Sequence, residues 1–322
     1  MQCHFNGTLL ISVLPPLLVT EFVLGILGNG LALWIFSFHM KPWKSSTVLL
    51  FNLAVADFLL NMALPFRASY YISELNWKFG SAFCNICLFM LAMNRSGSTI
   101  FLMAIAVDRY MRVVHPHHPI NSLSVPKAMC GSLVLWMLSI SMSAHVFTLK
   151  HNKTYCESFM VETQPQLNLS WHKFAFLFSF FIPLVVIIYC TVHIIVHLRR
   201  RQLAQQAKIK KALCFITVVA VLFIICFFPS NFMQLLIWAR TQRLANSLPA
   251  SEVCSALENP TSLFYITISL TYLNSALDPV VYYFSSPTFK NFCRKALHLS
   301  AEISESTEKR IRETGSQSLS QL

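Results

Sequence analysis

Residues 88–110 read LFMLAMNRSGSTIFLMAIAVDRY, an apolar run that is long enough to cross a lipid bilayer yet carries two arginines. Arg95 lies inside the run, and Arg109 follows Asp108 at its end. The fourteen residues from Arg95 to Arg109 correspond to about 21 Å along an α-helix, at about 1.5 Å per residue. Placing an arginine at bilayer depth costs roughly 2.5–3.5 kcal/mol on insertion scales, so we expect both side chains to have functions.

The composition of the whole chain is that of a membrane protein. Of its 322 residues, 55% are hydrophobic and 12% are charged, whereas a soluble domain has about 25% charged residues. The mean hydropathy is +0.55. The net charge of +12 is spread between apolar runs rather than gathered in one soluble basic patch, which argues against nucleic-acid binding.

Seven apolar runs divide the chain, and each is long enough for a membrane-spanning helix of about 20 residues. The runs cover roughly residues 9–38, 47–71, 88–110, 128–149, 174–198, 212–238 and 263–284. The predicted fold class is therefore all-α, a seven-transmembrane helix bundle. Residues 9–284 form the predicted membrane domain, and residues 1–8 form an extracellular N-terminal tail.

Two further segments follow the seventh run. In residues 286–299, Phe289 and Phe292 fall opposite Lys290 and Arg294, which predicts a short amphipathic helix on the inner leaflet. Residues 300–322 are polar, so we expect a disordered cytoplasmic tail. On the predicted amphipathic helix, Cys293 is a candidate for palmitoylation.

Basic residues gather in the segments on one side of the predicted membrane. They include Lys41, Lys44, Arg112, Lys127, Arg199, Arg200, Lys208, Lys290 and Arg294. The positive-inside rule assigns this side to the cytoplasm, with the N-terminus outside and the C-terminus inside. We expect a multi-pass protein of the plasma membrane. Three glycosylation sequons fall on the outer side, at Asn6, Asn152 and Asn168.

Four of the ten cysteines fall on the outer side, where disulfides persist. Four cysteines allow three pairings, and we favour Cys84 with Cys156 and Cys3 with Cys254. The first pair would tie the top of the third span to the second outer loop. A separate histidine group, His115, His117 and His118, lies beside prolines, and we expect a solvated turn there rather than a metal site.

Short motifs occur in order, one in each span. They are GNG at 28–30, NLAVAD at 52–57, DRY at 108–110, Trp136, Pro183, CFFP at 226–229 and DPVVY at 278–282. Together they resemble the rhodopsin-like (class A) G-protein-coupled receptors over nearly the whole chain. Two departures are Asp278, where asparagine is commoner, and Phe227, where many members have tryptophan.

Closer matches narrow the resemblance. LFMLAMNRSGS, DRYMRVVHPHH, RRRQLAQQAKIKKA, CESF and LDPVVYYFSSP are similar to the hydroxycarboxylic acid receptors, which include the lactate and niacin receptors. The oxoeicosanoid receptor is a near relative. The resemblance implies that Arg95 holds a ligand carboxylate and that Ser158 and Tyr272 contact the acid. Arg67 resembles an arginine of the lactate receptor, whereas a further family arginine falls at Gln234.

The chemistry of Arg95 agrees with this role, because a guanidinium presents a planar fork that matches a carboxylate. The alternative is an internal ion pair with Asp57, Asp278 or Glu21. For Arg67, the alternative to a ligand contact is an arginine that extends its charge to the membrane surface. Two apolar residues complete the predicted pocket. They are Leu91, which stands where amine receptors have an acidic anchor, and Trp77, which is alternatively a packing or interfacial residue.

A second polar group matches the sodium site of many rhodopsin-like receptors. It consists of Asp57, Asn94, Ser98, Asn274 and Asp278. Oxygen ligands suit a hard cation such as sodium, although a hydrogen-bonded polar core without an ion is the alternative. We expect no other cofactor or metal. The activation switch is expected to comprise Asp108, Arg109, Tyr110, Phe227, Pro229, Pro279 and Tyr282, with Asp108 pairing with Arg109 at rest.

The predicted function is that of a receptor for a small hydroxycarboxylic acid. The resemblance implies coupling to inhibitory G proteins, which lowers cAMP, with arrestin and receptor kinases acting on the tail. An oxidised fatty acid is the alternative ligand. A carboxylate transporter would show repeat symmetry, and a light receptor would need a lysine in the seventh span. An enzyme is not expected, because no nucleophile–base set is visible.

Overall fold

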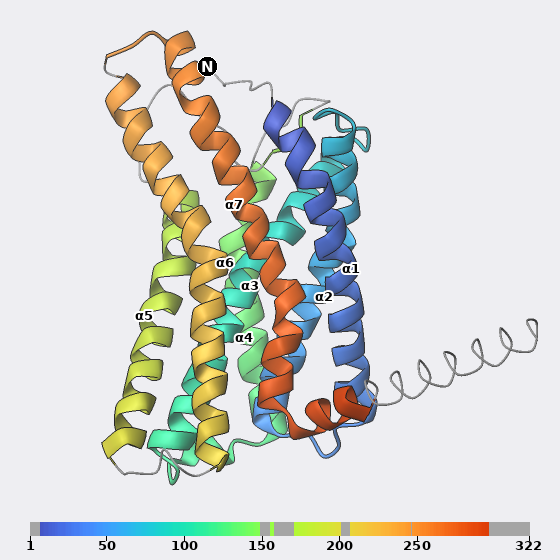
Figure 1. Cartoon of the computed structure of the whole chain (residues 1–322), viewed down its shortest axis with the longest axis vertical. Helices are drawn as coiled ribbons and strands as arrows, with labels where there is room; N and C mark the ends of the chain where they lie inside the picture. Colours follow the sequence, from blue (N-terminus) through green and yellow to red (C-terminus); the bar gives the residue numbers. More distant parts are fainter. Residues whose placement is uncertain (1–6, 149–154, 158–170, 201–206, 246, 296–322) are drawn as a thin grey trace, which may run out of the picture.

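The computed structural model describes residues 7–148, 155–157, 171–200, 207–245 and 247–295 (Figure 1). These residues form seven long helices that lie side by side in one bundle, and they contain no strand. The helices are α1 (Thr8–Phe38), α2 (Ser45–Ile72), α3 (Ser81–Val114), α4 (Val125–Ser143), α5 (Trp171–Arg200), α6 (Ala207–Ala245) and α7 (Ala250–Ser285). Two short 3-10 helices flank α4: η1 (Pro119–Ser122) and η2 (Ala144–Thr148). The predicted all-α fold is confirmed.

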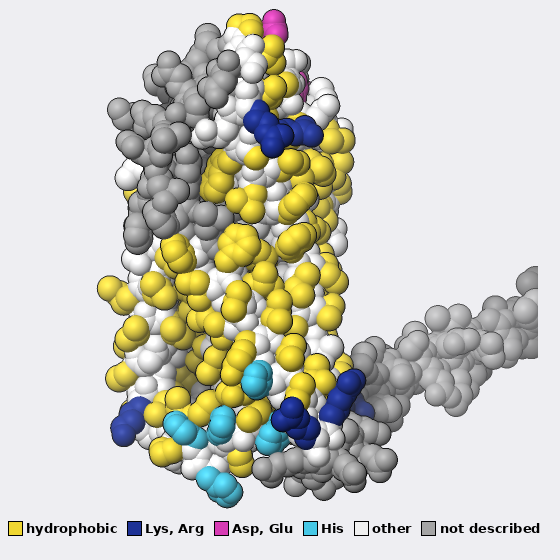
Figure 2. Space-filling model, turned by 90° about the vertical axis from the view of Figure 1, so that its left-hand side faces the viewer, with side chains coloured by type: hydrophobic (Ala, Val, Ile, Leu, Met, Phe, Trp, Pro, Cys, Tyr) yellow, Lys and Arg dark blue, Asp and Glu magenta, His cyan; other side chains and the backbone are white. Residues whose placement is uncertain are grey.

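Six helices in the described part of the chain are long and apolar enough to cross a membrane: α1, α2, α3, α4 with η2, α5 and α6. The bilayer interior offers no water to backbone groups, so helices that satisfy their own hydrogen bonds are favoured there. Large apolar side chains such as Leu27 and Phe38 are 66% and 70% exposed, as expected for lipid-facing positions. Figure 2 shows hydrophobic side chains over the middle of one face, with lysine and arginine gathered toward its two ends.

Helix α7 differs from the other six because polar residues interrupt its apolar sequence. Asn274, Ser275 and Asp278 are all buried, so the polar face of α7 turns into the bundle rather than toward lipid. The long helix α3 lies at the centre and contacts α2, α4, α5, α6 and α7. The interior therefore has a polar layer where α7 approaches α2 and α3.

Helix α1 closes the bundle by packing on both α2 and α7. A Cβ atom at Gly28 would lie 2.6 Å from the ring of Pro279, so only glycine permits this approach of α1 to α7. The next residue, Asn29, is buried and donates a hydrogen bond of 2.7 Å to the carbonyl of Ser275. Asn29 also accepts one from the hydroxyl of Tyr282 at 3.2 Å. The GN motif thus joins the first helix to the last.

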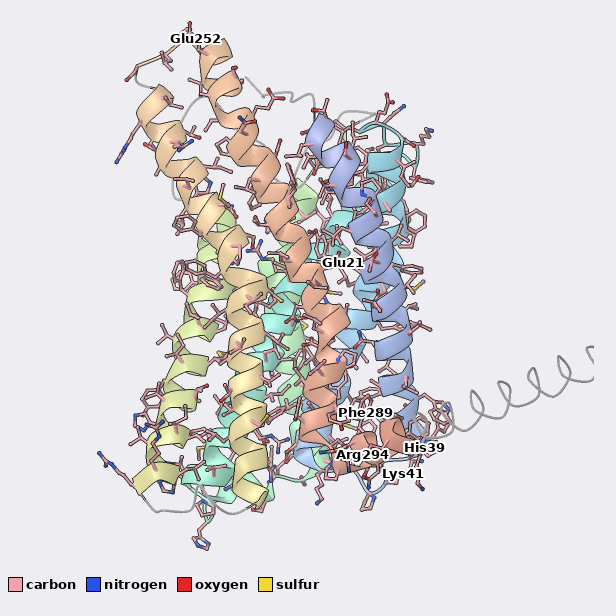
Figure 3. The ribbon with its side chains drawn as sticks, in the orientation of Figure 1. Glu21, His39, Lys41, Glu252, Phe289 and Arg294 are labelled. Carbon is pink, nitrogen blue, oxygen red and sulfur yellow. A yellow bond between two sulfur atoms is a disulfide. The ribbon has the colours of Figure 1, made fainter. Side chains whose placement is uncertain are left out.

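A further helix over residues 287–295 lies across the base of the bundle (Figure 1). The short eighth helix predicted after the seventh span is confirmed, whereas its predicted bounds of 286–299 extend beyond the described residues. Phe289 is 2% exposed and packs beneath the bundle, and the ring of Phe292 lies 5.3 Å from that of Trp34 (Figure 3). Its apolar face therefore contacts protein as well as the predicted leaflet.

Candidate ligand site and switch region

The arginine inside the third span lies where α3 faces α7. Arg95 is half-buried, one turn of α3 below the buried Leu91. The phenol of Tyr272 on α7 lies close enough to interact electrostatically with the Arg95 guanidinium. The structure therefore brings together a cation and a hydroxyl that were predicted to contact one ligand. Gln234 on α6 is also buried, and its Oε1 has no hydrogen-bond partner among the described residues.

The carboxylates proposed as internal partners of Arg95 lie in other environments. Glu21 is buried on α1, and neither of its carboxylate oxygens has a hydrogen-bond partner in the described part of the chain. Asp57 accepts hydrogen bonds at both oxygens, from Ser275 at 2.8 Å and from Tyr282 at 3.2 Å. The hydrogen bonding of Glu21 and Asp57 therefore does not support an internal ion pair of either residue with Arg95.

The second arginine of the predicted pocket has an internal partner. Arg67 is 4% exposed, and its Nη2 lies 2.9 Å from Oε2 of Glu157 in the second outer loop. The same guanidinium donates to the hydroxyl of Tyr71 at 2.7 Å and to the carbonyl of Cys156 at 2.5 Å. The surface-reaching alternative for Arg67 is therefore wrong. Sequence reasoning missed Glu157, although CESF places it directly after the loop cysteine.

The predicted disulfide between Cys84 and Cys156 is confirmed, with the two Cα atoms 5.8 Å apart. It joins the outer end of α3 to residues 155–157, and the Arg67–Glu157 ion pair joins the same short segment to α2. Burial raises the pKa of the neighbouring Tyr155 phenol. Cys254 is also disulfide-bonded, whereas its predicted partner Cys3 lies outside the described residues.

The predicted sodium site forms a compact hydrogen-bonded group between α2, α3 and α7. Oδ1 of Asp57 accepts from Asn94 and Ser98, each at 3.2 Å. On α7, Asn274 donates to Oδ2 of Asp278 at 3.0 Å. Ser275, which also bonds Asp57, was not predicted, because a serine in an apolar run carries no distinctive signal.

Unsatisfied oxygens in this polar group fit a cation. The carboxyls of Asp57 and Asp278 lie against each other, and two neighbouring carboxylates require a shared proton or a cation between them. Oδ1 of Asn274 and Oδ1 of Asp278 are buried without a hydrogen-bond partner among the described residues. Buried acceptors of this kind are expected to meet a donor or a hard ion.

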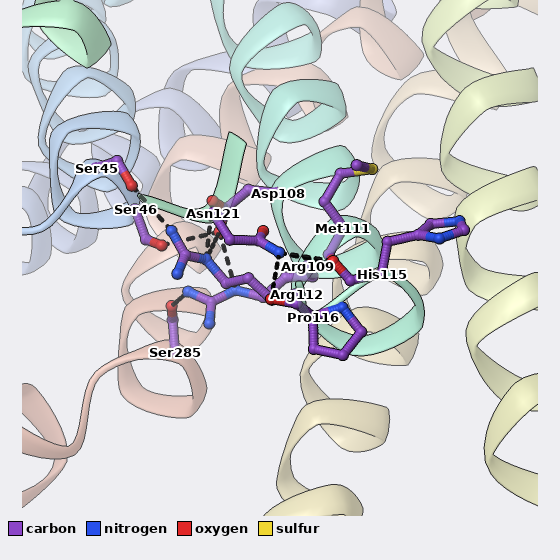
Figure 4. A network of polar contacts seen from close by, with 10 residues as sticks. All are labelled: Ser45, Ser46, Asp108, Arg109, Met111, Arg112, His115, Pro116, Asn121 and Ser285. Atoms are coloured by element: carbon purple, nitrogen blue, oxygen red, sulfur yellow. Dashed lines mark hydrogen bonds and ion pairs between the residues drawn. The ribbon is translucent and has the colours of Figure 1, made fainter. Parts of the chain in front are cut away.

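The contacts at the C-terminal end of α3 differ from the sequence prediction (Figure 4). Asp108 and Arg109 approach only to 3.9 Å, so the predicted pairing is weak. Asp108 instead accepts from Nε of Arg112 at 3.0 Å at both oxygens and from Ser46 at 2.8 Å. Neighbouring residues on a helix do not face each other, whereas residues four apart do. This spacing explains why Arg112, rather than Arg109, holds Asp108.

Arg109 reaches across the base of the bundle to α6 and α7. Its Nη2 donates to the hydroxyl of Ser285 at 2.8 Å, and its Cζ lies 5.0 Å from the ring centroid of Phe215. On α6, Pro229 has no N–H to continue the helix hydrogen bonds, and Asn231 donates to the carbonyl of Phe227 at 2.7 Å. The buried rings of Phe227 and Phe223 lie 5.0 Å apart beside this proline.

Comparison with known proteins agrees with the family that the sequence motifs indicated. Residues 28–282 match the family described as 7 transmembrane receptor (rhodopsin family). The chain belongs to this family. Its members are receptors rather than enzymes, and they act with a ligand and a G protein.

The receptor is similar to several curated proteins over most of its length. It is 48% identical to human hydroxycarboxylic acid receptor 2, over 90% of this chain and 79% of that protein. It is 46% identical to human hydroxycarboxylic acid receptor 1, over 91% of this chain and 82% of the relative. Human oxoeicosanoid receptor 1 is 41% identical, over 92% of this chain and 76% of that receptor. The resemblance predicted from the sequence is confirmed.

Other predicted residues of the receptor have packing roles or lie outside the described ranges. Trp77 is 3% exposed, and its ring N–H donates to the carbonyl of Gly80 at 2.7 Å, which favours the packing alternative. Tyr110 lies at the end of α3, with its hydroxyl 3.3 Å from Nε2 of His115. Cys293 is a free thiol, and burial raises its pKa. The positions outside the described residues are Ser158, Asn6, Asn152 and Asn168.

The histidines between α3 and α4 line a cavity at the end of the bundle where α3 ends. The cavity of about 630 Å³ is bordered by His115, His117 and His118 from the loop and by His197 from α5. Within the described ranges, no three histidine, cysteine or acidic side chains are placed to hold a metal ion.

Proposed function

We propose that this receptor binds a small hydroxycarboxylic acid through Arg95 and signals through inhibitory G proteins, which lower cAMP. The observation that carries the proposal is the position of Arg95 inside the membrane, where its guanidinium interacts with Tyr272 across the bundle. A guanidinium in a site of lowered dielectric binds a carboxylate more strongly than in water. Relatives at 46% and 48% identity are named hydroxycarboxylic acid receptors, which supports the same ligand class.

The proposed orientation places the receptor in the plasma membrane with its N-terminus outside. The Cys84–Cys156 disulfide supports this orientation, because disulfides persist outside the cell. Several lysines and arginines lie at the helix ends on the opposite side of the bundle, which supports a cytoplasmic face there. They include Lys41, Lys44, Arg112, Lys127, Arg199, Arg200, Lys290 and Arg294. Arrestin and receptor kinases are proposed to act on the C-terminal tail.

An oxidised fatty acid is a second candidate ligand. It is favoured by the 41% identity to human oxoeicosanoid receptor 1 and by the uncharged Gln234 on α6. A long acyl chain needs apolar volume, whereas a short hydroxy acid needs polar groups near its hydroxyl. The two candidates therefore differ in how potency changes with chain length.

A graded series of acids tests the proposal directly. Cells expressing the receptor, and matched cells without it, receive 2-hydroxy acids of three to eight carbons, their deoxy analogues and a hydroxylated long-chain fatty acid. We expect the short hydroxy acids to suppress stimulated cAMP and a toxin that inactivates inhibitory G proteins to abolish the effect. Suppression by the long-chain acid alone would establish the alternative, and suppression that resists the toxin would contradict the G-protein class.

We also propose that sodium binds among Asp57, Asn94, Ser98, Asn274 and Asp278. The ion would supply a positive charge between the two carboxylates, and these residues would hold it by oxygen atoms. Replacing sodium chloride with choline chloride at equal ionic strength is expected to raise agonist affinity several-fold in the wild type. Asp57→Asn should lose this sodium dependence while still binding agonist. An affinity indifferent to sodium in the wild type would favour the polar core without an ion.

A further inference from the structure

Positive charge gathers at the end of the bundle where α1 ends and where the helix that follows α7 lies. The cations are Lys41, Lys44, Lys290, Arg294 and Lys295. All of them except Lys290 are exposed, and none forms an ion pair within the described ranges. Residues 22–56 and 279–301 contain no aspartate or glutamate, and Asp108 at the same end is bound by Arg112. This group of cations, the basic cluster, therefore has no counter-charge in the described part of the chain.

Two segments supply the basic cluster, and they pack against each other. Two of the lysines lie between α1 and α2, and the other three cations lie on the helix after α7. The ring of His39 in the first segment lies 4.3 Å from that of Trp34 on α1 and 5.7 Å from that of Phe292 in the second segment. The ring N–H of Trp43 donates to the carbonyl of Phe36 at 2.9 Å, which holds the first segment against α1. These contacts fix the two groups of cations relative to each other.

A stripe of exposed apolar side chains on α1 leads to the basic cluster. The stripe consists of Leu27, Leu31, Trp34 and Phe38. Spacings of four, three and four residues place these side chains on one face of the helix. At about 1.5 Å per residue the stripe is about 16 Å long, close to half of the ~30 Å hydrocarbon core of a bilayer. This face therefore matches a phospholipid, with the acyl chains along the stripe and the headgroup at the basic cluster.

The charge of the basic cluster distinguishes among phospholipid headgroups. A phosphatidylcholine headgroup has no net charge, and a phosphatidylserine headgroup has a single negative charge. An inositol phospholipid adds about −1.5 to −2 for each phosphate monoester on its ring, so one headgroup meets several cations at once. The guanidinium of Arg294 is also able to bind a phosphate at two points. A headgroup with several phosphates therefore fits the cluster best.

We propose that the basic cluster and the α1 stripe bind one inositol phospholipid that carries phosphate monoesters on its headgroup. Figure 3 shows His39, Lys41 and Arg294 in the same region at the base of the bundle. A headgroup bound by both Lys41 and Arg294 joins the segment after α1 to the helix after α7 and stabilises their packing. The site belongs to the chain itself. Its use in the cell rests on the proposed orientation, which places this end of the bundle at the leaflet rich in anionic lipids.

Lipid binding is measured on the purified full-length receptor in detergent by native mass spectrometry, which counts bound lipid molecules. The probes are phosphatidylinositol bisphosphate, phosphatidylserine with the same acyl chains, and soluble inositol trisphosphate. One molecule of the bisphosphate lipid should bind about ten-fold more tightly than either other probe, the effect of one or two further cation contacts. Equal affinity for phosphatidylserine would overturn the proposed headgroup. Equal affinity for the soluble trisphosphate would overturn the proposed lipid, because the α1 stripe would then contribute nothing.

Lys41→Gln and Arg294→Gln test the two sides of the site separately. Each should weaken binding of the bisphosphate lipid about five-fold, which corresponds to about 1 kcal/mol at 1.4 kcal/mol per tenfold. The double variant should weaken it about 25-fold, because the two cations lie on different segments and act independently. Both side chains are exposed and outside the described ion pairs, so the variants should keep the fold. Unchanged binding in the double variant would overturn the proposal.

Lys127→Gln is the matched control for these charge changes. Lys127 is exposed at the start of α4, at the same end of the bundle, and the substitution removes the same charge. Binding of the bisphosphate lipid should stay within about two-fold of the wild type. A loss equal to that of Lys41→Gln would show a diffuse attraction to every cation at this end, and it would overturn the proposed site.

The α1 stripe has a test of its own. Phe38→Ser removes the exposed ring nearest to the basic cluster along α1, so it should weaken the bisphosphate lipid about five-fold and leave binding of the soluble trisphosphate unchanged. Equal losses for the two probes would contradict the seating of the acyl chains on α1. These measurements use neither an agonist nor a G protein, so their outcome is independent of the proposed function.

A bilayer provides the second readout. In phosphatidylcholine nanodiscs, the bisphosphate lipid at about ten times its dissociation constant should raise the apparent Tm of the wild type by about 2–3 °C. The Lys41→Gln, Arg294→Gln double variant should lose most of this rise. An equal rise in the double variant would place the lipid elsewhere on the receptor and overturn the proposal.

Discussion

Replacing Arg95 with alanine is expected to raise the acid concentration for half-maximal signalling by roughly 30-fold to several thousand-fold. The ligand carboxylate would lose its charged partner, a change that costs about 2–5 kcal/mol when the pair is buried. The half-buried position of Arg95 opposite Tyr272 places it within this range. Suppression of cAMP by a graded series of acid concentrations measures the effect, with surface expression quantified by an N-terminal epitope tag.

Two companion variants separate the charge from its geometry. Arg95→Lys should recover part of the potency, because lysine keeps the charge but does not bind a carboxylate at two points. Arg240→Gln removes an equal charge from an exposed site on the outer part of α6 and should leave potency within about two-fold. Normal potency in Arg95→Ala would disprove the role of this arginine as the ligand anchor.

Replacing Glu157 with glutamine is expected to lower the thermal stability of the receptor more than any surface substitution. Arg67 would keep its charge in a buried site after losing its counter-charge, which costs about 3–5 kcal/mol. For a chain of this size the apparent Tm should fall by about 4–7 °C. A dye that reacts with newly exposed thiols reports the transition through the buried Cys87, Cys190 and Cys226.

The control for this loss is Glu74→Gln, which removes an exposed carboxylate from the first outer loop. Its Tm should stay within about 2 °C of the wild type, because exposed charges contribute little. Arg67→Gln combined with Glu157→Gln should recover most of the stability, since neither residue is then charged. An unchanged Tm in Glu157→Gln would mean that the ion pair does not contribute to holding the outer loop on α2.

The helices were predictable because each follows from a local property of the sequence. An apolar run of about 20 residues has few alternatives in a membrane, and the seven runs match α1 to α7. The helices extend beyond the apolar runs: α3 begins at Ser81 and ends at Val114, outside residues 88–110. The apolar runs did not include the polar residues at the helix ends, so the predicted helices were shorter than the observed ones.

The contacts within the site were less predictable because they join distant segments. Glu157 lies 90 residues from Arg67, and Ser275 lies 218 residues from Asp57, so no periodicity relates either pair. The pairing of Asp108 with Arg109 was inferred from adjacency, although adjacent side chains on a helix point in different directions. The spacing of Asp108 and Arg112 carried the correct signal, since side chains four residues apart share a face.

The hydrogen bonds of Asn29 have a consequence for the order of synthesis. Its partners on α7, Ser275 and Tyr282, follow it by 246 and 253 residues. At roughly 5–20 residues per second, a ribosome needs about 12–50 s to reach them. During that interval the Asn29 amide is in the membrane with a bond to the carbonyl of Gly25 in its own helix. The hydrogen bonds of Asn29 on α1, the first helix to be inserted, are therefore complete only after α7, the last helix, has been synthesised.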